Sequence, residues 1–376
     1  MKFRVERDVL ADAVAWTART LPTRPTVPVL AGLRLDAADG PGGQVALSAF
    51  DYEVSGRVVV DAEVADEGTV LVSGRLLADI CRSLPDRPVD ITADAGKVAL
   101  TCGSARFTLL TLPVAEYPDL PEMPPDTGTV PSSLLAGAVG QVAVAAGRDD
   151  MLPLLTGIRV EIEGARVTLA ATDRYRLAVR ELDWHPTQPG VSAVALVPAR
   201  TLADTAKSLT GEVTLALAGP GSDTLLGLTA GGRRTTTRLI DGEFPKYRSL
   251  FPAESLTSAR VETAALVEAV KRVALVAERN TPVRLSFADD QVVLEAGSGE
   301  DAQASESLPA IIEGDPVSIG FNPGYLLDGL GAIDAAWAHL SFTQSTRPAV
   351  IQGVDAADGD LRGDYRYLLM PVRLSG

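Results

Sequence analysis

The 376-residue sequence contains only two histidines and two cysteines, and these scarcities limit the chemistry that it can perform. His185 falls where we expect a turn, and His339 alternates with apolar residues in an expected strand. Neither has a serine or cysteine motif beside it that would complete a catalytic triad. Cys81 lies in a helical pattern and Cys102 in a strand pattern, which favours two free, buried thiols over a disulfide. The sequence therefore argues against hydrolytic and redox chemistry.

Long apolar runs and cofactor motifs are also missing. No apolar segment follows the first residues and none approaches the length of a membrane span, so we expect a cytoplasmic protein. The stretch AGPGSDTLLG lacks the Lys-Ser/Thr pair that ends a phosphate-binding loop. The paired acids Asp149-Asp150 and Asp289-Asp290 are typical of turns and helix ends rather than of a metal site. We therefore expect no cofactor, no metal and no catalytic residue.

The overall composition is that of a globular protein. Charged residues make up 22% of the chain and hydrophobic residues 46%, and the length suits two or three domains, each with its own core. The formal net charge of -15 argues against a protein whose whole surface coats nucleic acid. A local basic lining built from some of the 34 lysines and arginines remains compatible with this charge.

Internal repeats organise the chain. SGRLLADICRSLP (Ser73 to Pro85) and VPARTLADTAKSLT (Val197 to Thr210) share one skeleton, and FNPGYLLDGLGAI (Phe321 to Ile333) is a fainter copy. Each of these three copies follows a unit in which we expect a helix, an arginine, a link that contains proline, and a strand. Each precedes one of the strands ARFTLLTLP, RRTTTRLIDGEFP and DYRYLLMPVRL, in which we expect Arg233 to Arg238 to be a solvated strand face.

Because three units recur in one order, we predict an α+β protein with three tandem copies of a domain of two helices and two groups of short strands. The domain boundaries predicted are 1–122, 129–252 and 258–376, with linkers at the proline- and serine-containing stretches 121–131 and 251–260. The alternative is two unrelated domains that share a helix motif.

Basic residues recur at matching places in the three copies. Such copies could form a curved array with its helices on one side, and two chains joined end to end would close a ring. Basic side chains lining the hole would meet phosphates without reading bases. The alternative is that these are solvated charges at helix ends. The residues concerned are Arg24, Arg75, Arg148, Arg200, Lys207 and Arg279.

The stretch ATDRYRLAV, Ala171 to Val179, is predicted to be a strand that enters a tight polar turn and leaves again. Thr172 and Asp173 can bond their own backbone across such a turn. Tyr175 and Leu177, two residues apart in an extended segment, would point to the same side and form a shallow apolar pocket with a charged lip. The alternative is a hairpin whose aromatic side chain packs into the core.

These motifs, in this order and over the whole length, resemble those of the bacterial DNA sliding clamps, the beta subunits of the replicative DNA polymerase III, and especially the actinobacterial ones. The resemblance is carried by MKFRVERDVL, RPTVPVLAGL, SGRLLADICRSLP, FTLLTLPVAEYPDLP, ATDRYRLAV, DGEFPKYRSLFP, GFNPGYLLDGL and YLLMPVRL. It implies a non-catalytic processivity factor, a head-to-tail dimer that forms a ring of six similar domains around double-stranded DNA.

The resemblance also implies a pocket in which the replicative polymerase, the clamp loader and repair polymerases dock motifs of the Gln-Leu-x-Leu-Phe kind. Two or three buried apolar ligand side chains, each contributing about 1.5 to 3 kcal/mol before ordering costs, predict micromolar affinity. By resemblance the pocket residues are Leu155, Thr172, Arg174, Tyr175, Arg176, Leu177, Pro245, Leu250, Asn322, Tyr325, Thr346, Pro348, Leu368, Met370, Pro371, Val372 and Arg373.

At one point the chain departs from many clamps, which have Gly and His where it has Arg174 and Tyr175, so the lip is bulkier and more basic. By resemblance the dimer contact joins Arg106 and Phe107 of one chain to Leu275 and Val276 of the other, although Phe107 would also suit an ordinary strand core. Two further hypotheses remain: a peptide-binding adaptor that no longer encircles DNA, and a second, resistant clamp copy that meets cyclic peptide antibiotics.

Overall fold

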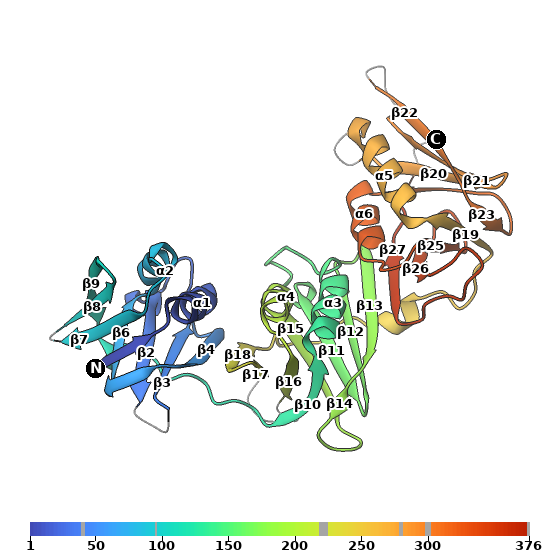
Figure 1. Ribbon diagram of the computed structural model, residues 1–376. Helices are drawn as coiled ribbons and strands as arrows, with labels where there is room; N and C mark the ends of the chain where they lie inside the picture. Colours follow the sequence, from blue (N-terminus) through green and yellow to red (C-terminus); the bar gives the residue numbers. More distant parts are fainter. Residues whose placement is uncertain (39–41, 95, 218–224, 278–280, 298–301, 374–376) are drawn as a thin grey trace. The chain divides into compact units, whose positions relative to one another are not determined.

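The structure is a computed structural model of the chain, and it describes all residues except 39–41, 95, 218–224, 278–280, 298–301 and 374–376 (Figure 1). The described residues form an α+β fold in which one series of nine strands and two α-helices occurs three times in order. The first series comprises β1 (Lys2–Val5), α1 (Arg7–Thr17), β2 (Gly32–Ala38), β3 (Gln44–Phe50), β4 (Val54–Asp61), β5 (Glu63–Asp66), β6 (Gly68–Ser73), α2 (Gly74–Ser83), β7 (Val89–Asp94), β8 (Lys97–Cys102) and β9 (Ala105–Leu112).

The second and third series have the same order of elements. The second comprises β10 (Asp126–Pro131), α3 (Ser132–Ala143), β11 (Gly157–Glu163), β12 (Arg166–Thr172), β13 (Arg176–Asp183), β14 (His185–Pro186), β15 (Ser192–Pro198), α4 (Ala199–Ser208), β16 (Glu212–Leu217), β17 (Leu225–Ala230) and β18 (Arg233–Arg238). The third comprises β19 (Thr257–Glu262), α5 (Thr263–Val273), β20 (Val283–Ala288), β21 (Gln291–Ala296), β22 (Ala304–Pro309), β23 (Ile311–Glu313), β24 (Val317–Phe321), α6 (Pro323–Gly331), β25 (Trp337–Phe342), β26 (Ala349–Val354) and β27 (Tyr365–Leu369).

Strand pairing repeats together with the order of elements. In the first series β1 pairs with β7, β2 with β3 and β6, and β3 with β4, all antiparallel. The corresponding pairs β10·β16, β11·β12, β11·β15 and β12·β13 form in the second series, and β19·β25, β20·β21, β20·β24 and β21·β22 in the third. The hypothesis of two unrelated domains is therefore wrong.

Two further pairs join one series to the next. β4 pairs with β18, and β13, the counterpart of β4, pairs with β27, the counterpart of β18. β22 and β9 hold the remaining equivalent positions, and neither has such a partner in the described part of the chain. One strand without a partner from another series therefore remains at each end of the three series, in the described part of the chain.

The described residues divide into two compact units. The first contains Met1–Ser133, His185–Gln188 and Asp204–Leu239, and its strands form one sheet in the order β14-β10-β16-β17-β18-β4-β3-β2-β6-β9-β8-β7-β1-β5. The second contains Leu134–Trp184, Pro189–Ala203 and Ile240–Gly376, with a sheet in the order β15-β11-β12-β13-β27-β26-β25-β19-β23 and another in the order β22-β21-β20-β24.

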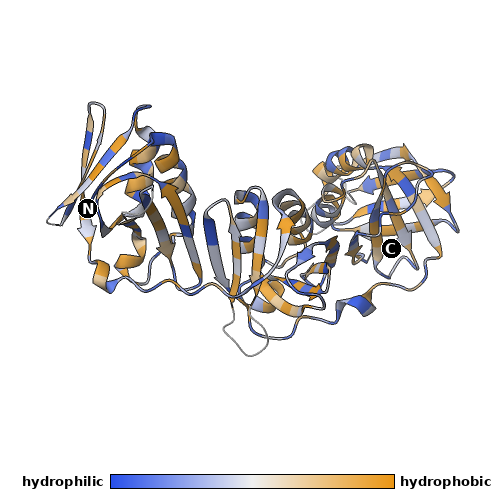
Figure 2. Cartoon of the chain, turned by 60° about the horizontal axis from the view of Figure 1, so that its bottom comes forward, coloured by the Kyte–Doolittle hydropathy of each residue, from blue (hydrophilic) through white to orange (hydrophobic). Residues whose placement is uncertain are grey.

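Apolar and polar residues alternate along many strands, as the colouring in Figure 2 shows. Such a strand turns its apolar residues to one face, toward the core between the helices and the sheet. Helix α1 buries Leu10, Ala13, Val14 and Thr17, which lie on one face because three or four residues separate them. In the first unit this face packs into a core with side chains from both groups of strands of its series. None of the described helices is long and apolar enough to cross a membrane.

Cys81 in α2 and Cys102 in β8 are both buried and free, which confirms the expectation of two buried thiols. The Cys102 thiol donates to the carbonyl oxygens of Pro85 and Arg87 over 3.3 and 3.2 Å. Burial raises the pKa of the Cys81 thiol to about 12, so the thiolate that would react with oxidants or disulfides is suppressed.

Two sequence expectations, about the exposure of one strand and about the linkers, need correction. Arg233–Arg238 is only partly solvated: Arg234 and Arg238 are exposed, but Thr235, Thr236 and Thr237 are buried in β18, which lies between β17 and β4. The expected linkers are shorter, since β10 begins at Asp126 and β19 at Thr257. Most of the stretch AGPGSDTLLG lies outside the described residues.

Two expectations about turns differ in outcome. Asp289 and Asp290 occupy the turn between β20 and β21 with positive φ angles of 51° and 57°, and Asp149 accepts from the Met151 amide over 3.0 Å as a turn residue does, so the turn assignment is confirmed. His185 begins the short strand β14, which pairs with β10, instead of lying in a turn.

His339 supplies a pH dependence of stability. It lies in β25 opposite Arg260, is 8% exposed, and has an Nδ1 atom without a hydrogen-bond partner in the described residues. Burial, and then the charge of Arg260, lower the pKa of His339, against a smaller opposing effect of Glu313. Below pH 6.5 the unfolded chain therefore binds a proton that the folded chain excludes, and stability falls with pH until the lowered pKa is reached.

We expect His339→Gln to remove this part of the loss of stability between pH 7 and pH 5. The exposed His185 gives a matched control, because His185→Gln changes the only other histidine. Urea unfolding of the three proteins at pH 7, 6 and 5 measures the effect. An equally steep decrease in His339→Gln would contradict the assignment.

Candidate functional site

The turn between β12 and β13 is held by an aspartate and a threonine. The Asp173 Oδ1 atom accepts from the amides of Tyr175 and Arg176 over 3.0 and 3.1 Å. The Thr172 hydroxyl donates to the Arg176 carbonyl over 2.7 Å and accepts from the Arg174 amide over 3.2 Å. Arg174 takes a left-handed conformation, with φ of 79°, which these bonds stabilise. The turn therefore presents Arg174 and Tyr175 outward on a rigid base.

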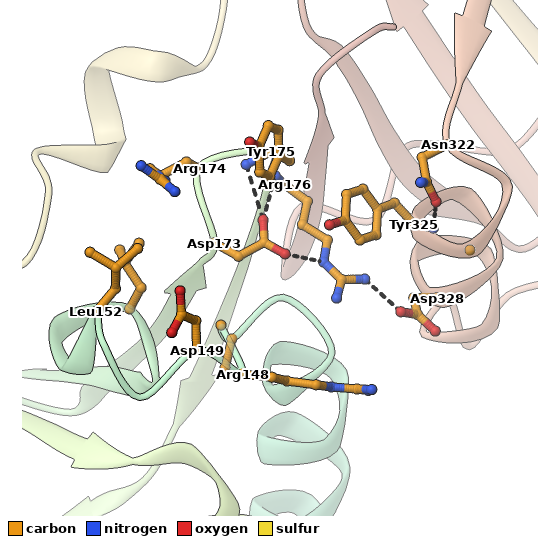
Figure 3. Close-up of a pocket in the computed structure, with 14 residues that line it drawn as sticks. Arg148, Asp149, Leu152, Asp173, Arg174, Tyr175, Arg176, Asn322, Tyr325 and Asp328 are labelled. Carbon is orange, nitrogen blue, oxygen red and sulfur yellow. Dashed lines mark hydrogen bonds and ion pairs between the residues drawn. The ribbon is translucent and has the colours of Figure 1, made fainter. Parts of the chain in front are cut away.

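Arg176 connects this turn to a helix that lies far along the chain (Figure 3). Its side chain is 5% exposed; Nε donates to Asp173 Oδ2 over 2.9 Å, and one terminal nitrogen donates to Asp328 Oδ2 over 2.5 Å. The guanidinium carbon also lies 4.3 Å from the centre of the Tyr325 ring. Burial disfavours the charge, but the bond to Asp328 and the neighbouring acidic groups outweigh it and raise the pKa of Arg176. Arg176 therefore stays charged.

Helix α6 supplies the opposite wall. Asn322 caps its N-terminus by accepting from the Tyr325 amide over 3.1 Å, and the Tyr325 ring stacks on the Tyr175 ring with centres 6.2 Å apart. The Tyr367 hydroxyl donates to the Tyr325 carbonyl over 2.8 Å, and burial raises the pKa of Tyr367 so that this proton is retained. The helix is thus fixed against β27.

A cavity of about 610 Å³ lies between this turn, α6 and the loop after α3. The loop is closed by a hydrogen bond of 2.6 Å from the Gly147 amide to the Leu155 carbonyl. The lining includes both apolar and charged side chains, which suits a ligand with apolar side chains and backbone polar groups. The lining residues are Ala146, Gly147, Arg148, Asp149, Leu152, Leu155, Asp173, Arg174, Tyr175, Arg176, Asn322, Gly324, Tyr325 and Asp328.

A patch of core lies beside the turn and includes two of the predicted pocket residues. Leu177 and Leu368 face each other across β13 and β27 and pack with Phe244 and Tyr247 of the connection between the second and third series. Glu161 in β11 anchors this connection by accepting from the Tyr247 hydroxyl over 2.9 Å and from Arg248 over 2.5 Å. The connection that carries Pro245 and Leu250 is therefore tied to the sheet.

The structure places only some of the predicted pocket residues on the cavity. Six line it: Leu155, Arg174, Tyr175, Arg176, Asn322 and Tyr325. Tyr175 is 54% exposed, so the alternative in which the aromatic packs into the core is wrong. Thr172, Leu177 and Leu368 are buried and do not line the cavity. Eight others are exposed or half-buried outside this lining: Pro245, Leu250, Thr346, Pro348, Met370, Pro371, Val372 and Arg373.

Several lining residues were not predicted as pocket residues. Asp173 and Asp328 hold Arg176, and Arg148, predicted to face DNA, borders the cavity beside Asp149. The signal for Asp328 was present, because it repeats Asp79 and Asp204 in the three copies of the motif. Nothing in the sequence, however, indicated that the third copy faces the turn of the second.

The predicted basic residues that the structure describes lie in connections, near helix starts, or, for Lys207, in the last turn of α4. Arg24, Arg75, Arg148, Arg200 and Lys207 are exposed, and one Arg75 nitrogen donates to the Pro22 carbonyl over 2.9 Å. Arg279 lies outside the described residues. In the first two copies the arginine is well separated from the first helix, because α1 ends at Thr17 and α3 at Ala143, before Arg24 and Arg148.

The predicted dimer residues lie on β9 and in the short helix that follows α5. Arg106 is exposed and Phe107 half-buried on β9, where Phe107 packs partly against the first core. Leu275, 84% exposed, and the half-buried Val276 lie in the 3-10 helix Ala274–Val276 that follows α5.

The threefold series and the connected sheets define a three-domain α+β clamp fold. Residues 1–121, 129–246 and 248–373 match the N-terminal, central and C-terminal domains of the DNA polymerase III beta subunit. The chain is 63% identical to the beta sliding clamp of Streptomyces coelicolor over 379 residues, with 100% of each chain covered. It is 50% identical over 375 residues to the beta sliding clamp homolog GriR of Streptomyces muensis, with 99% of each covered.

A solved structure agrees with these matches. The sliding clamp of Pseudomonas aeruginosa, bound to griselimycin, is 29% identical and superimposes with a TM-score of 0.90 over 100% of both chains. The chain therefore belongs to the beta subunits of DNA polymerase III, the beta sliding clamps, and is a non-catalytic processivity subunit in DNA replication. The resemblance to actinobacterial clamps is confirmed.

Proposed function

We propose that two copies of the chain close head to tail into a ring around double-stranded DNA, with three domains per chain bounded at 1–122, 129–252 and 258–376. The observation that carries this proposal is the strand pairing. β4·β18 and β13·β27 join successive domains, whereas β9 and β22, at the two remaining equivalent positions, pair with no strand of another domain in the described residues. On the edge in question, β9 pairs with β6 of its own domain at Thr111 and Leu112. A second copy would supply each edge with the missing strand, and such a heterologous contact generates a ring when its rotation closes.

The exposed apolar side chains near these edges support the same contact. Leu110 on β9 is 72% exposed and Leu275 beside α5 is 84% exposed, and Arg106, Phe107 and Val276 lie next to them. In the ring, the basic residues Arg24, Arg75, Arg148, Arg200, Lys207 and Arg279 would contact phosphates, with a salt-dependent affinity that is independent of base sequence.

Leu275→Asp is expected to convert the dimer into a monomer and to abolish retention on circular DNA, because it places a charge in an apolar contact. Leu256→Asp is the matched control, since Leu256 is 67% exposed and lies outside the proposed contact. Light scattering after size exclusion and retention on nicked plasmid measure the two effects. A dimeric Leu275→Asp protein, or a wild-type monomer at micromolar concentration, would count against the ring.

We also propose that the cavity beside Tyr175 docks short linear motifs of the polymerase, the clamp loader and repair polymerases. The support is a rigid lip with Tyr325 and Tyr175 stacked at its edge, and a lining that includes the apolar side chains of Leu152 and Leu155. Because a solved relative is bound to griselimycin, this compound is a suitable second probe.

A fluorescent Gln-Leu-x-Leu-Phe peptide is expected to bind with micromolar affinity, and Tyr325→Ala to weaken it by about tenfold, because an aromatic contact contributes about 0.5 to 1.5 kcal/mol beyond its buried area. Lys207→Glu is the control: it should reduce DNA retention and leave peptide binding unchanged. Arg148 is unsuited to this purpose because it borders the cavity. Equal peptide affinity in Tyr325→Ala and wild type would argue for another docking surface.

A further inference from the structure

A second cavity, of about 470 Å³, lies in the first compact unit where β4 pairs with β18. A row of directly opposed residues crosses its floor, in the order Arg34 on β2, Ser48 on β3, Arg57 on β4 and Arg234 on β18. Directly opposed residues share a face of the sheet, so three guanidinium groups converge on one cavity.

Two of these arginines have no ion-pair partner among the described residues. Arg34 pairs with Asp36 at 3.0 Å, and the Thr69 hydroxyl donates to the same carboxylate over 2.7 Å. Arg57 and Arg234 are exposed, stand directly opposite each other, and form no ion pair within the described part of the chain. Like charges in this position destabilise a sheet unless an anion lies between them. The fold alone therefore gives no reason for this pair.

Hydroxyl groups lie at the base of the same cavity. Ser48, Ser55 and Thr236 line it and are 2%, 4% and 3% exposed. The Ser55 and Thr236 hydroxyls bond each other over 2.6 Å, and because each hydroxyl carries one hydrogen, one of the two retains a donor for another acceptor.

The equivalent place in the second compact unit shows what the fold requires there. The corresponding row is Arg159, Ala170, Val179 and Arg366, and the pair that corresponds to Ser55 and Thr236 is Leu177 and Leu368. These middle positions are apolar and covered by Phe244, Tyr247 and Phe251. Both outer arginines there have partners: Arg159 bonds Glu161 over 2.5 Å, and Arg366 lies 4.6 Å from the centre of the Phe251 ring. An apolar, filled junction is thus sufficient for the fold.

We infer that the cavity between β4 and β18 is a binding site for a phosphate-type oxyanion, held between Arg57 and Arg234 with hydroxyl donors beneath it. A guanidinium presents paired donors that match the oxygens of such an anion, and two of them neutralise a dianion. The Glu122 carboxylate also lines the cavity, from the segment between the first and second domains, and competes with the ligand for the arginines.

Titration calorimetry with inorganic pyrophosphate, and separately with inorganic phosphate, at constant ionic strength tests this site on the full chain. Arg57→Gln and Arg234→Gln are each expected to weaken binding by about tenfold or more, because each removes charged hydrogen bonds. Glu122→Gln should strengthen binding by removing the competitor. Arg4→Gln, which removes an exposed arginine from β1, is the matched control and should leave affinity unchanged.

Two further measurements test whether Arg57→Gln still folds and which kind of molecule supplies the phosphate. Arg57→Gln should melt at the same or a higher temperature than wild type without phosphate, because the repulsion between like charges is gone. A single-stranded oligonucleotide without terminal phosphates tests whether the bound phosphate belongs to a nucleic-acid backbone. If the oligonucleotide binds wild type but not Arg57→Gln, and pyrophosphate does not bind, the site is assigned to a nucleic-acid backbone. Absence of binding by all three probes, or binding retained in both arginine variants, would overturn the inference.

Discussion

Replacing Arg176 by alanine is expected to lower the free energy of unfolding of the second compact unit by about 3 kcal/mol, the lower end of the range for removing one partner of a buried ion pair. The substitution leaves Asp173, with a side chain 13% exposed, without its cation. Asp328 is 43% exposed and can be solvated, which keeps the cost at this lower end. The contact with the Tyr325 ring is lost as well.

Arg174→Ala is the control for this change. Arg174 is exposed and its side chain has no bond within the described residues, so we expect a change within about 0.5 kcal/mol. Urea unfolding followed by circular dichroism compares the two variants with wild type. Similar midpoints for Arg176→Ala and Arg174→Ala would show that the network of Asp173, Arg176 and Asp328 does not stabilise the unit.

Replacing Gly329 by alanine is expected to destabilise the unit by about 2 kcal/mol, in the range for overpacking a core. A Cβ atom at this position of α6 would lie 2.4 and 2.5 Å from two carbons of the Tyr367 ring. Tyr367 is fully buried and its hydroxyl bonds the Tyr325 carbonyl, so the ring has little freedom to move. The helix must shift instead, and Tyr325 and Asp328 shift with it.

Gly331→Ala provides the matched control on the same helix, because nothing lies within 4 Å of the added Cβ atom. Alanine favours a helix over glycine by about 1 kcal/mol, so this variant should be as stable as wild type or slightly more so. Thermal unfolding and peptide titration are measured on both. If the helix shift removes one contact of about 1.4 kcal/mol, peptide affinity falls tenfold in Gly329→Ala alone. Unchanged stability in Gly329→Ala would mean that Tyr367 can move.

The two junctions show how one pairing scheme supports different surfaces. Both place an aspartate at the start of a tight turn, since Asp51 accepts from the amides of Glu53 and Val54 as Asp173 does from Tyr175 and Arg176. The residues after these aspartates, Tyr52 and Arg174, both have positive φ angles, of 75° and 79°. The side chains differ at the equivalent sheet positions, so one junction has a polar cavity and the other an apolar patch.

The sequence by itself determined the local structure and its repetition. Helices, strands and turns follow from hydrophobic period and turn residues, and the hydrogen bonds of Thr172 and Asp173 span only four residues at most, so local spacing is enough to predict the turn. The threefold motif around Asp79, Asp204 and Asp328 likewise predicted three similar domains. The family resemblance depended on the same local motifs.

Only the tertiary structure decided which strands join successive domains and what lies at those junctions. Thr235, Thr236 and Thr237 are buried in β18, which pairs with β4, and the polar sequence RRTTTR does not indicate this burial. Arg176 meets Asp328 across 152 residues of chain, and no local period encodes such a contact. Burial and ion pairing depend on neighbours brought together by these long-range pairings, and for that reason they lie beyond what spacing along the chain can predict.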